Sequence, residues 1–78
     1  MKELIEYIAT SLVADPSQVR VTQFQRGNMV TLKLQVGKDD MGRVIGKNGR
    51  VANSIRILLR VAAAQEGKRA TLDVDEPR

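Results

Sequence analysis

Two glycines three residues apart, Gly46 and Gly49, enclose Lys47 and Asn48, and Arg50 follows at once. Glycine lets the backbone adopt conformations closed to other residues, and it lacks the Cβ atom that would hold a bound chain away. A helix that starts just after such a turn points unpaired amides and a partial positive charge at the same place. These residues therefore predict a turn that contacts phosphate groups. A tight turn made for helix packing alone is the alternative.

Two familiar phosphate-binding motifs do not fit this segment. Three residues separate Gly42 from Gly46, whereas a P-loop has four before its Gly-Lys-Ser/Thr, and Asn48 stands where the hydroxyl should be. No Gly-x-Gly-x-x-Gly is present, and the turn is expected to join two helices instead of a strand and a helix. The spacing excludes both motifs and leaves a Gly-x-x-Gly turn between helices.

The basic residues concentrate around this turn. From Gly42 to Arg69 the chain has seven lysines and arginines and a single acid, Glu66, so this segment carries +6 while the rest of the chain carries −2. One-sided charge of this kind is typical of a surface that binds a polyanion. The alternative is a solvated helix surface.

Hydrophobic periodicity and turn residues predict the elements that position this segment. They are, in order, a helix at 2–13, strands at 19–25 and 30–36, a short helix carrying Met41, Val44 and Ile45, a helix at 50–65 and a strand at 69–75. Asp39 or Asp40 is expected to cap the short helix, and Gly67 to end the long one.

The order helix-strand-strand-helix-helix-strand predicts an α+β fold. The strands on either side of the helix pair are too far apart in sequence for a hairpin, so they should be parallel, joined by a right-handed crossover. The expected architecture is a three-stranded mixed sheet packed on one face by three helices. A chain of 78 residues without linker or repeat is expected to be one domain, residues 1–78.

Between two helices in this order, the run Ile45-Gly46-Lys47-Asn48-Gly49-Arg50 resembles the signature of the KH domain. In that family the Gly-x-x-Gly turn clamps the backbone of about four nucleotides. The helix and strand at the start of the chain are similar to the bacterial type II arrangement, and the chain length is similar to that of the KhpA family of small RNA-binding proteins. This resemblance implies that the protein binds RNA, dimerises and pairs with a larger KH-containing RNA-binding protein.

Carried over to matching positions, the resemblance implies an RNA site around the turn. The clamp would consist of Gly46, Lys47, Asn48 and Gly49, with Arg43 and Arg50 flanking it. The other candidates are Val44, Ile45, Val51 and Ser54, which would line the groove for the bases, and Lys68 and Arg69, in the short loop before the last strand.

The long helix has two apolar stripes on a helical wheel. The predicted core face contains Val51, Ile55, Leu58, Leu59 and Ala62. Ile57, Val61 and Ala64 lie nearly opposite and are a candidate dimer interface. The alternative is that Ile57 and Val61 pack under the N-terminal helix. Between the stripes, Asn53, Arg56 and Arg60 are available to phosphates.

Other function classes fit the sequence less well. The chain has no histidine and no cysteine, so the usual general base and thiol nucleophile are missing, and its acids lack recognisable metal-ligand spacing. We therefore expect that the protein is not an enzyme and that it binds no metal and no cofactor. Its apolar runs are too short for a membrane span and its start lacks the organisation of a signal peptide, so we expect a cytoplasmic protein with no membrane partner.

The expected function is to grip single-stranded RNA with low sequence specificity, as an RNA chaperone or post-transcriptional regulator. Base reading should be weak because the only aromatic residues, Tyr7 and Phe24, lie outside the basic segment. Two alternatives remain open: a dimerisation module with little RNA binding of its own, and binding to single-stranded DNA.

Overall fold

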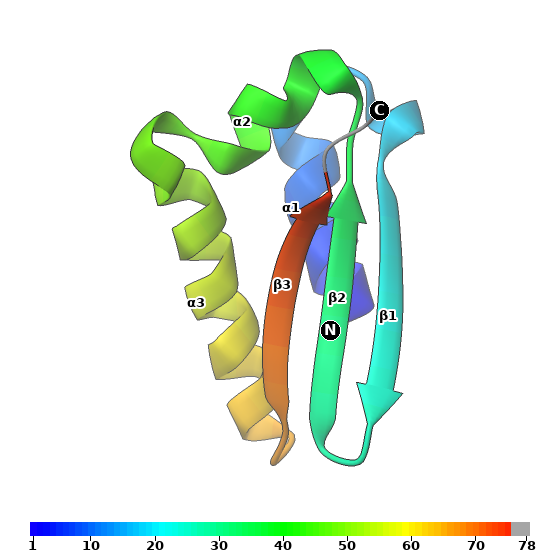
Figure 1. Cartoon of the computed structure of the whole chain (residues 1–78), viewed down its shortest axis with the longest axis vertical. Coiled ribbons are helices and arrows are strands. Elements are labelled where there is room, and N and C mark those ends of the chain that lie inside the picture. The colour runs from blue at the N-terminus through cyan, green and yellow to red at the C-terminus, as the bar shows by residue number, and fades with distance from the viewer. Residues whose placement is uncertain (76–78) are drawn as a thin grey trace.

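The chain folds in the predicted order of elements (Figure 1), and the computed structural model describes residues 1–75. The last three residues of the predicted domain lie outside this part. The helices are α1 (Lys2–Leu12), α2 (Met41–Ile45) and α3 (Arg50–Gln65), and the strands are β1 (Arg20–Arg26), β2 (Met29–Gln35) and β3 (Arg69–Asp75). Three short 3₁₀ turns connect them: η1 (Pro16–Gln18), η2 (Lys38–Asp40) and η3 (Lys47–Gly49).

The sheet is mixed and has the order β1-β2-β3, which confirms the predicted α+β architecture. β2 is antiparallel to β1 and parallel to β3, so that Leu32 is opposite both Gln23 and Leu72. The crossover from β2 to β3 contains α2 and α3, as a parallel connection requires. β1 and β3 are the edge strands of the sheet, and the helices lie on one side of it.

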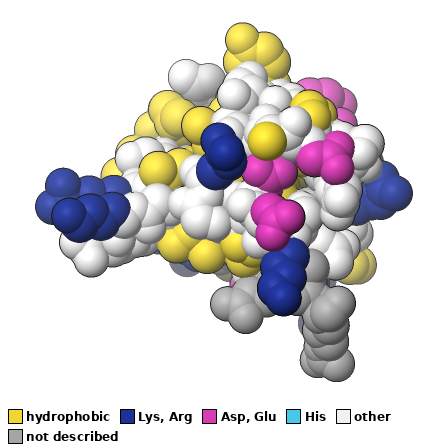
Figure 2. All heavy atoms as spheres, turned by 90° about the horizontal axis from the view of Figure 1, so that it is seen from above, with side chains coloured by type: hydrophobic (Ala, Val, Ile, Leu, Met, Phe, Trp, Pro, Cys, Tyr) yellow, Lys and Arg dark blue, Asp and Glu magenta, His cyan; other side chains and the backbone are white. Residues whose placement is uncertain are grey.

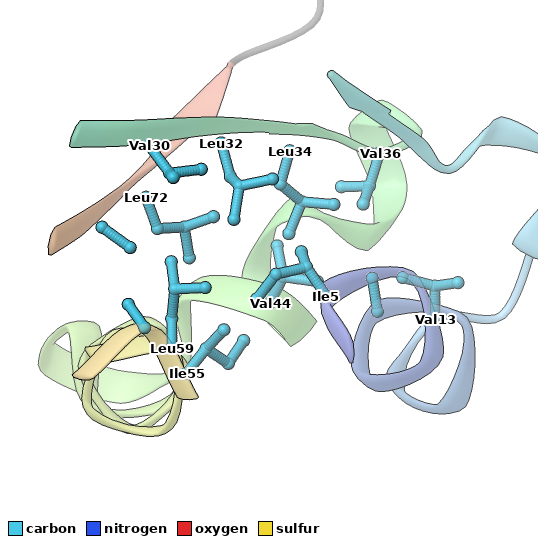
Figure 3. Close-up of a cluster of buried hydrophobic side chains, with 13 residues drawn as sticks. Ile5, Val13, Val30, Leu32, Leu34, Val36, Val44, Ile55, Leu59 and Leu72 are labelled. Atoms are coloured by element: carbon cyan, nitrogen blue, oxygen red, sulfur yellow. The ribbon is translucent and has the colours of Figure 1, made fainter. Parts of the chain in front are cut away.

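The core lies between this sheet and the helices (Figure 3). Alternate side chains of β2 point toward the helices, where Ile5 of α1, Val44 of α2 and Leu59 of α3 meet them, and all three are fully buried. The strand residues that they meet are Val30, Leu32, Leu34 and Leu72. None of the helices in residues 1–75 is long and apolar enough to cross a membrane.

The core face of α3 differs from the predicted one. Ile55 and Leu59 are buried as expected, but the other buried positions are Ala52 and Ala63, while Leu58 is 52% exposed. Small alanine side chains at these positions let a helix pack closely against a sheet. The prediction that Leu58 belongs to the core is wrong.

The end of α3 has the predicted glycine. Gly67 adopts a positive φ of 69°, and the amides of Gly67 and Lys68 donate to the carbonyls of Ala64 (3.1 Å) and Ala63 (2.9 Å). This pair of hydrogen bonds is the Schellman motif, which satisfies carbonyls at the end of a helix. It also brings the chain directly into β3.

Candidate nucleic-acid interface

The turn between α2 and α3 has a backbone that few residue types adopt. Gly46 has φ 75° and ψ 172°, a combination that is essentially restricted to glycine. Asn48 (φ 58°) and Gly49 (φ 74°) are in the left-handed region, which asparagine and glycine occupy more readily than other residues. Each of these residue types therefore suits the conformation at its position.

The two glycines have different surroundings. A Cβ atom on Gly46 would overlap Cγ2 of Val51 and come within 2.8 Å of its Cβ, whereas a Cβ atom on Gly49 would meet nothing within 4 Å. Gly46 therefore closes the turn against the first residues of α3. Gly49 leaves the outer side of the turn open to a bound chain.

Positive charge surrounds this open side. Lys47 and Arg50 are exposed, and α3 begins at Arg50, so the positive end of its helix dipole lies here. Figure 2 shows Lys and Arg side chains gathered on the projecting corner at the left, where the chain passes from α2 into α3 in Figure 1. Acidic side chains lie over the middle of the same view. The corner thus presents an open turn and positive charge to an anionic chain.

Asp40 fixes the start of α2 and so the position of the turn. Its side chain is 4% exposed and accepts hydrogen bonds from the amides of Ala14 (3.0 Å) and Asp15 (3.1 Å), after the end of α1. Nε of Arg43 also lies 3.1 Å from its Oδ1. Asp40 is the N-cap residue of α2, as predicted, but its side chain makes no capping hydrogen bond to this helix and bonds the segment after α1 instead.

A hollow follows the corner between α3 and β3. Nε of Arg56 donates to the carbonyl of Leu72 (3.3 Å), so this side chain bridges the helix to the outer edge of β3. The residues that line the hollow are Arg56, Arg60, Ala70, Thr71 and Leu72. The sequence predicts that both arginines are available to phosphates, since their spacing of four residues puts them on one face of a helix, but it does not place them in the RNA site around the turn.

A family model for the KhpA/KhpB KH domain matches residues 2–74. The chain belongs to this family. RNA-binding protein KhpA of Clostridium acetobutylicum is 43% identical over 74 residues, which cover 95% of this chain and 99% of that protein. KhpA of Halalkalibacterium halodurans is also 43% identical, over 95% of this chain and 97% of its own. KhpA of Chlamydia trachomatis is 37% identical over the full length of both chains.

Two solved structures of Era share the fold of this KH domain. Aquifex aeolicus Era bound to GDP and AlF4⁻ has a TM-score of 0.61, and Era in complex with MgGDPNP and nucleotides 1506–1542 of 16S ribosomal RNA has one of 0.55. Both are 19% identical to this chain, and the match covers 94% of this chain and 28% of theirs. Family membership confirms the predicted KH fold and the expectation that the protein is not an enzyme.

The structure of this KH domain changes the predicted groove lining. Val44 is fully buried in the core, so the prediction that it lines the groove is wrong. Ile45 and Val51 are half-buried and pack against the core, and the hydroxyl of Ser54 donates to the carbonyl of Arg50 (2.9 Å) on the exposed face of α3. The assignment of these three residues to the groove stays a prediction.

The two basic residues at the far end of the groove lie close to Arg60. Lys68 and Arg69 line a second hollow, which Arg60 and Ala64 border from α3. Arg69 is the first residue of β3 and not part of the preceding loop, so the sheet sets its direction. The basic side chains therefore continue along the whole length of α3.

The outer face of α3 in this KH domain is apolar. Ile57, Leu58 and Val61 are 58%, 52% and 54% exposed, so the alternative that Ile57 and Val61 pack under α1 is wrong. Leu58 is exposed next to the predicted interface residues and is added to them. Ala64, the third predicted residue, lines the second hollow. We call Ile57, Leu58 and Val61 the α3 patch.

Proposed function

We propose that this KH domain binds single-stranded RNA by placing backbone phosphates on the turn from Gly46 to Gly49. The observation that supports this most is the open turn itself, where three residues with positive φ lie on a projecting corner beside exposed Lys47 and Arg50. The relatives named RNA-binding protein KhpA and the RNA-bound Era structure point to the same class of ligand.

The chemistry of the corner suits a phosphate and not a base. Glycine at position 49 admits the sugar-phosphate chain closely, and the start of α3 adds amides and a partial positive charge. Lys47 and Arg50 neutralise phosphates and release counterions, so affinity should fall steeply with salt. The strand would then follow the hollow between α3 and β3, beside Arg56.

Base reading should be weak along this hollow. Its lining is aliphatic side chains, a threonine and two arginines, with no ring among them. Stacking on aromatic side chains is what holds bases most firmly in single-strand grooves. We therefore propose a binder of broad sequence specificity, acting as an RNA chaperone or post-transcriptional regulator.

Replacing Lys47 by Asp tests the clamp. We expect the affinity for a twelve-nucleotide RNA to fall about tenfold or more. The slope of log affinity against log salt concentration should become shallower by about 0.7 for each phosphate that is no longer neutralised. Fluorescence anisotropy across a salt series measures both. Lys38→Asp is the matched control, because Lys38 is also an exposed lysine at the start of a three-residue 3₁₀ turn.

The possible outcomes separate the candidate functions. An equal loss in both variants would mean general charge attraction and not a clamp, and an unchanged Lys47→Asp would remove the turn from the site. If the unmodified chain binds no RNA, the alternative of a dimerisation module is favoured. Equal binding to DNA of the same length would widen the ligand class to single strands in general.

We also propose that the α3 patch mediates self-association or pairing with a larger KH-containing protein. Three large apolar side chains more than half exposed on one helix favour contact with another apolar surface. Two linked sites would raise avidity for one RNA strand through effective concentration. Val61→Asp should convert a dimer to a monomer in light scattering, while Tyr7→Asp, at a 74% exposed site on α1, should not.

A further inference from the structure

The open face of the sheet carries an exposed aromatic ring at its hairpin end. Pairing of Phe24 with Thr31, and of Thr31 with Thr71, forms one row across the three strands. The hydroxyls of Thr31 and Thr71 lie 3.4 Å apart, and Phe24 is 55% exposed. In Figure 1 this is the face toward the reader, with α1 behind the strands. The ring thus lies next to Thr31 on the face of the sheet that is not covered by the helices.

The next row toward the hairpin is basic at both ends. It consists of Arg26, Met29 and Arg69, which pair across β1, β2 and β3. The acids of this face, Asp73 and Asp75, are in the rows at the other end of β3. Phe24 therefore lies in the part of the face whose charge favours an anionic ligand.

This part of the face lies next to the groove proposed for RNA. The hollow beside Arg56 shares Arg60 and Thr71 with the second hollow, which Met29 of β2 also lines. Met29 also lines a third hollow on the open face, together with Phe24 and Arg26. Neighbouring hollows with shared lining residues thus lie between the groove and the aromatic ring.

We propose that an RNA strand leaving the groove crosses the outer edge of β3 and stacks a base on Phe24. The site rests on the proposed function, since the same strand would occupy the turn and the ring. A ring more than half exposed, with Arg26 in the same hollow and Arg69 in the adjacent row, provides the two elements of a single-strand site, a stacking surface and phosphate neutralisation. α3 has 16 residues and is about 24 Å long, so the strand must extend beyond the four or so nucleotides that a KH turn clamps.

Oligomer length separates this site from the clamp. We would measure binding of uridine oligomers of four and twelve nucleotides to the full chain by fluorescence anisotropy. Phe24→Ala should weaken the twelve-nucleotide complex by about 5-fold to 100-fold and leave the four-nucleotide complex unchanged. Phe24→Leu, which keeps apolar bulk and lacks the ring, should show the same loss, while Phe24→Tyr should restore most of the affinity.

A tryptophan provides a direct reading of stacking. The chain has no tryptophan, so Phe24→Trp introduces a single reporter. Its fluorescence should be quenched by the twelve-nucleotide oligomer and not by the shorter one. Tyr7→Ala is the matched control, because Tyr7 is the other aromatic residue and lies on α1. It should leave both affinities unchanged.

The failures of the two proposals differ in this experiment. If both oligomers bind and Phe24→Ala changes neither, the stacking site is wrong and the clamp stands. If the twelve-nucleotide complex survives Lys47→Asp but not Phe24→Ala, the clamp is wrong and the ring is the primary site. Binding of neither oligomer overturns both. A change of oligomeric state in Phe24→Ala would mean that this face contacts protein, which also overturns the stacking site.

Discussion

The turn at Gly46–Gly49 and the hairpin end of the sheet, around Phe24, both expose basic side chains, but they obtain their shapes differently. In the turn the backbone itself is unusual, with a φ of 75° at Gly46 and left-handed residues after it. At the hairpin end the backbone is an ordinary ladder in which Phe24 pairs with Thr31. The first region is shaped by the conformation of its main chain, the second by which side chains the register turns outward.

This difference predicts how each region responds to substitution. Changes in the turn act on the backbone, so fold and binding should be lost together at the most constrained position. Outward side chains of the sheet contribute little to the core, so binding there should change while the fold persists. Substitutions in each region test this contrast.

Gly46→Ala should have the largest effect. Alanine would bring both an unfavourable conformation, about 1–3 kcal/mol, and overlap with Val51, about 1–3 kcal/mol more. Gly49→Ala has room for its Cβ and should cost only about 1–2 kcal/mol, from the left-handed conformation. Urea unfolding of both variants measures the difference.

A third variant tests the reason for that difference. Val51→Ala removes the side chain that the new Cβ atom would strike, so the cost of Gly46→Ala should be smaller in that background. Equal costs in both backgrounds would mean that conformation alone constrains Gly46. Equal costs at Gly46 and Gly49 would mean that the turn is less closed against α3 than the structure indicates.

Asp40→Ala should have the next largest effect, about 2–4 kcal/mol. The change leaves the amides of Ala14 and Asp15 without their acceptor in a part-buried place and removes the partner of Arg43. Thermal unfolding measures the loss. Asp39→Ala is the control, because Asp39 is an adjacent and exposed acid, and its cost should stay within about 0.5 kcal/mol. A similar loss in both variants would contradict an anchoring role for Asp40.

Much of the fold could be predicted from local patterns in the sequence. Alternation along β2 and the glycines at positions 46, 49 and 67 are local signals, and each corresponds to a feature of the structure. The orientation of α3 is not local. Its helical wheel favours the larger apolar residues, including Leu58, but packing against the sheet buries Ala52 and Ala63 instead.

Local sequence patterns predict only part of the candidate site as well. The turn could be predicted because the glycines themselves determine it, and Lys47 and Arg50 are its neighbours in sequence. Arg56 joins the hollow only because β3 brings the carbonyl of Leu72 to it from 16 residues away. Phe24 is turned outward by its pairing with Thr31, which a single strand pattern rich in polar residues does not reveal.

Thr71→Val should have the smallest effect and is the sharpest test of the contrast. Valine fits a strand well, and the substitution removes only an exposed hydroxyl contact of 3.4 Å with Thr31, so stability should change by less than about 0.5 kcal/mol. Urea unfolding measures this change. A loss of more than about 1 kcal/mol would mean that the outward row supports the fold. In that case Phe24, which is in the same row, could not be assigned to binding from affinities alone, and quenching of the Phe24→Trp reporter would have to decide it.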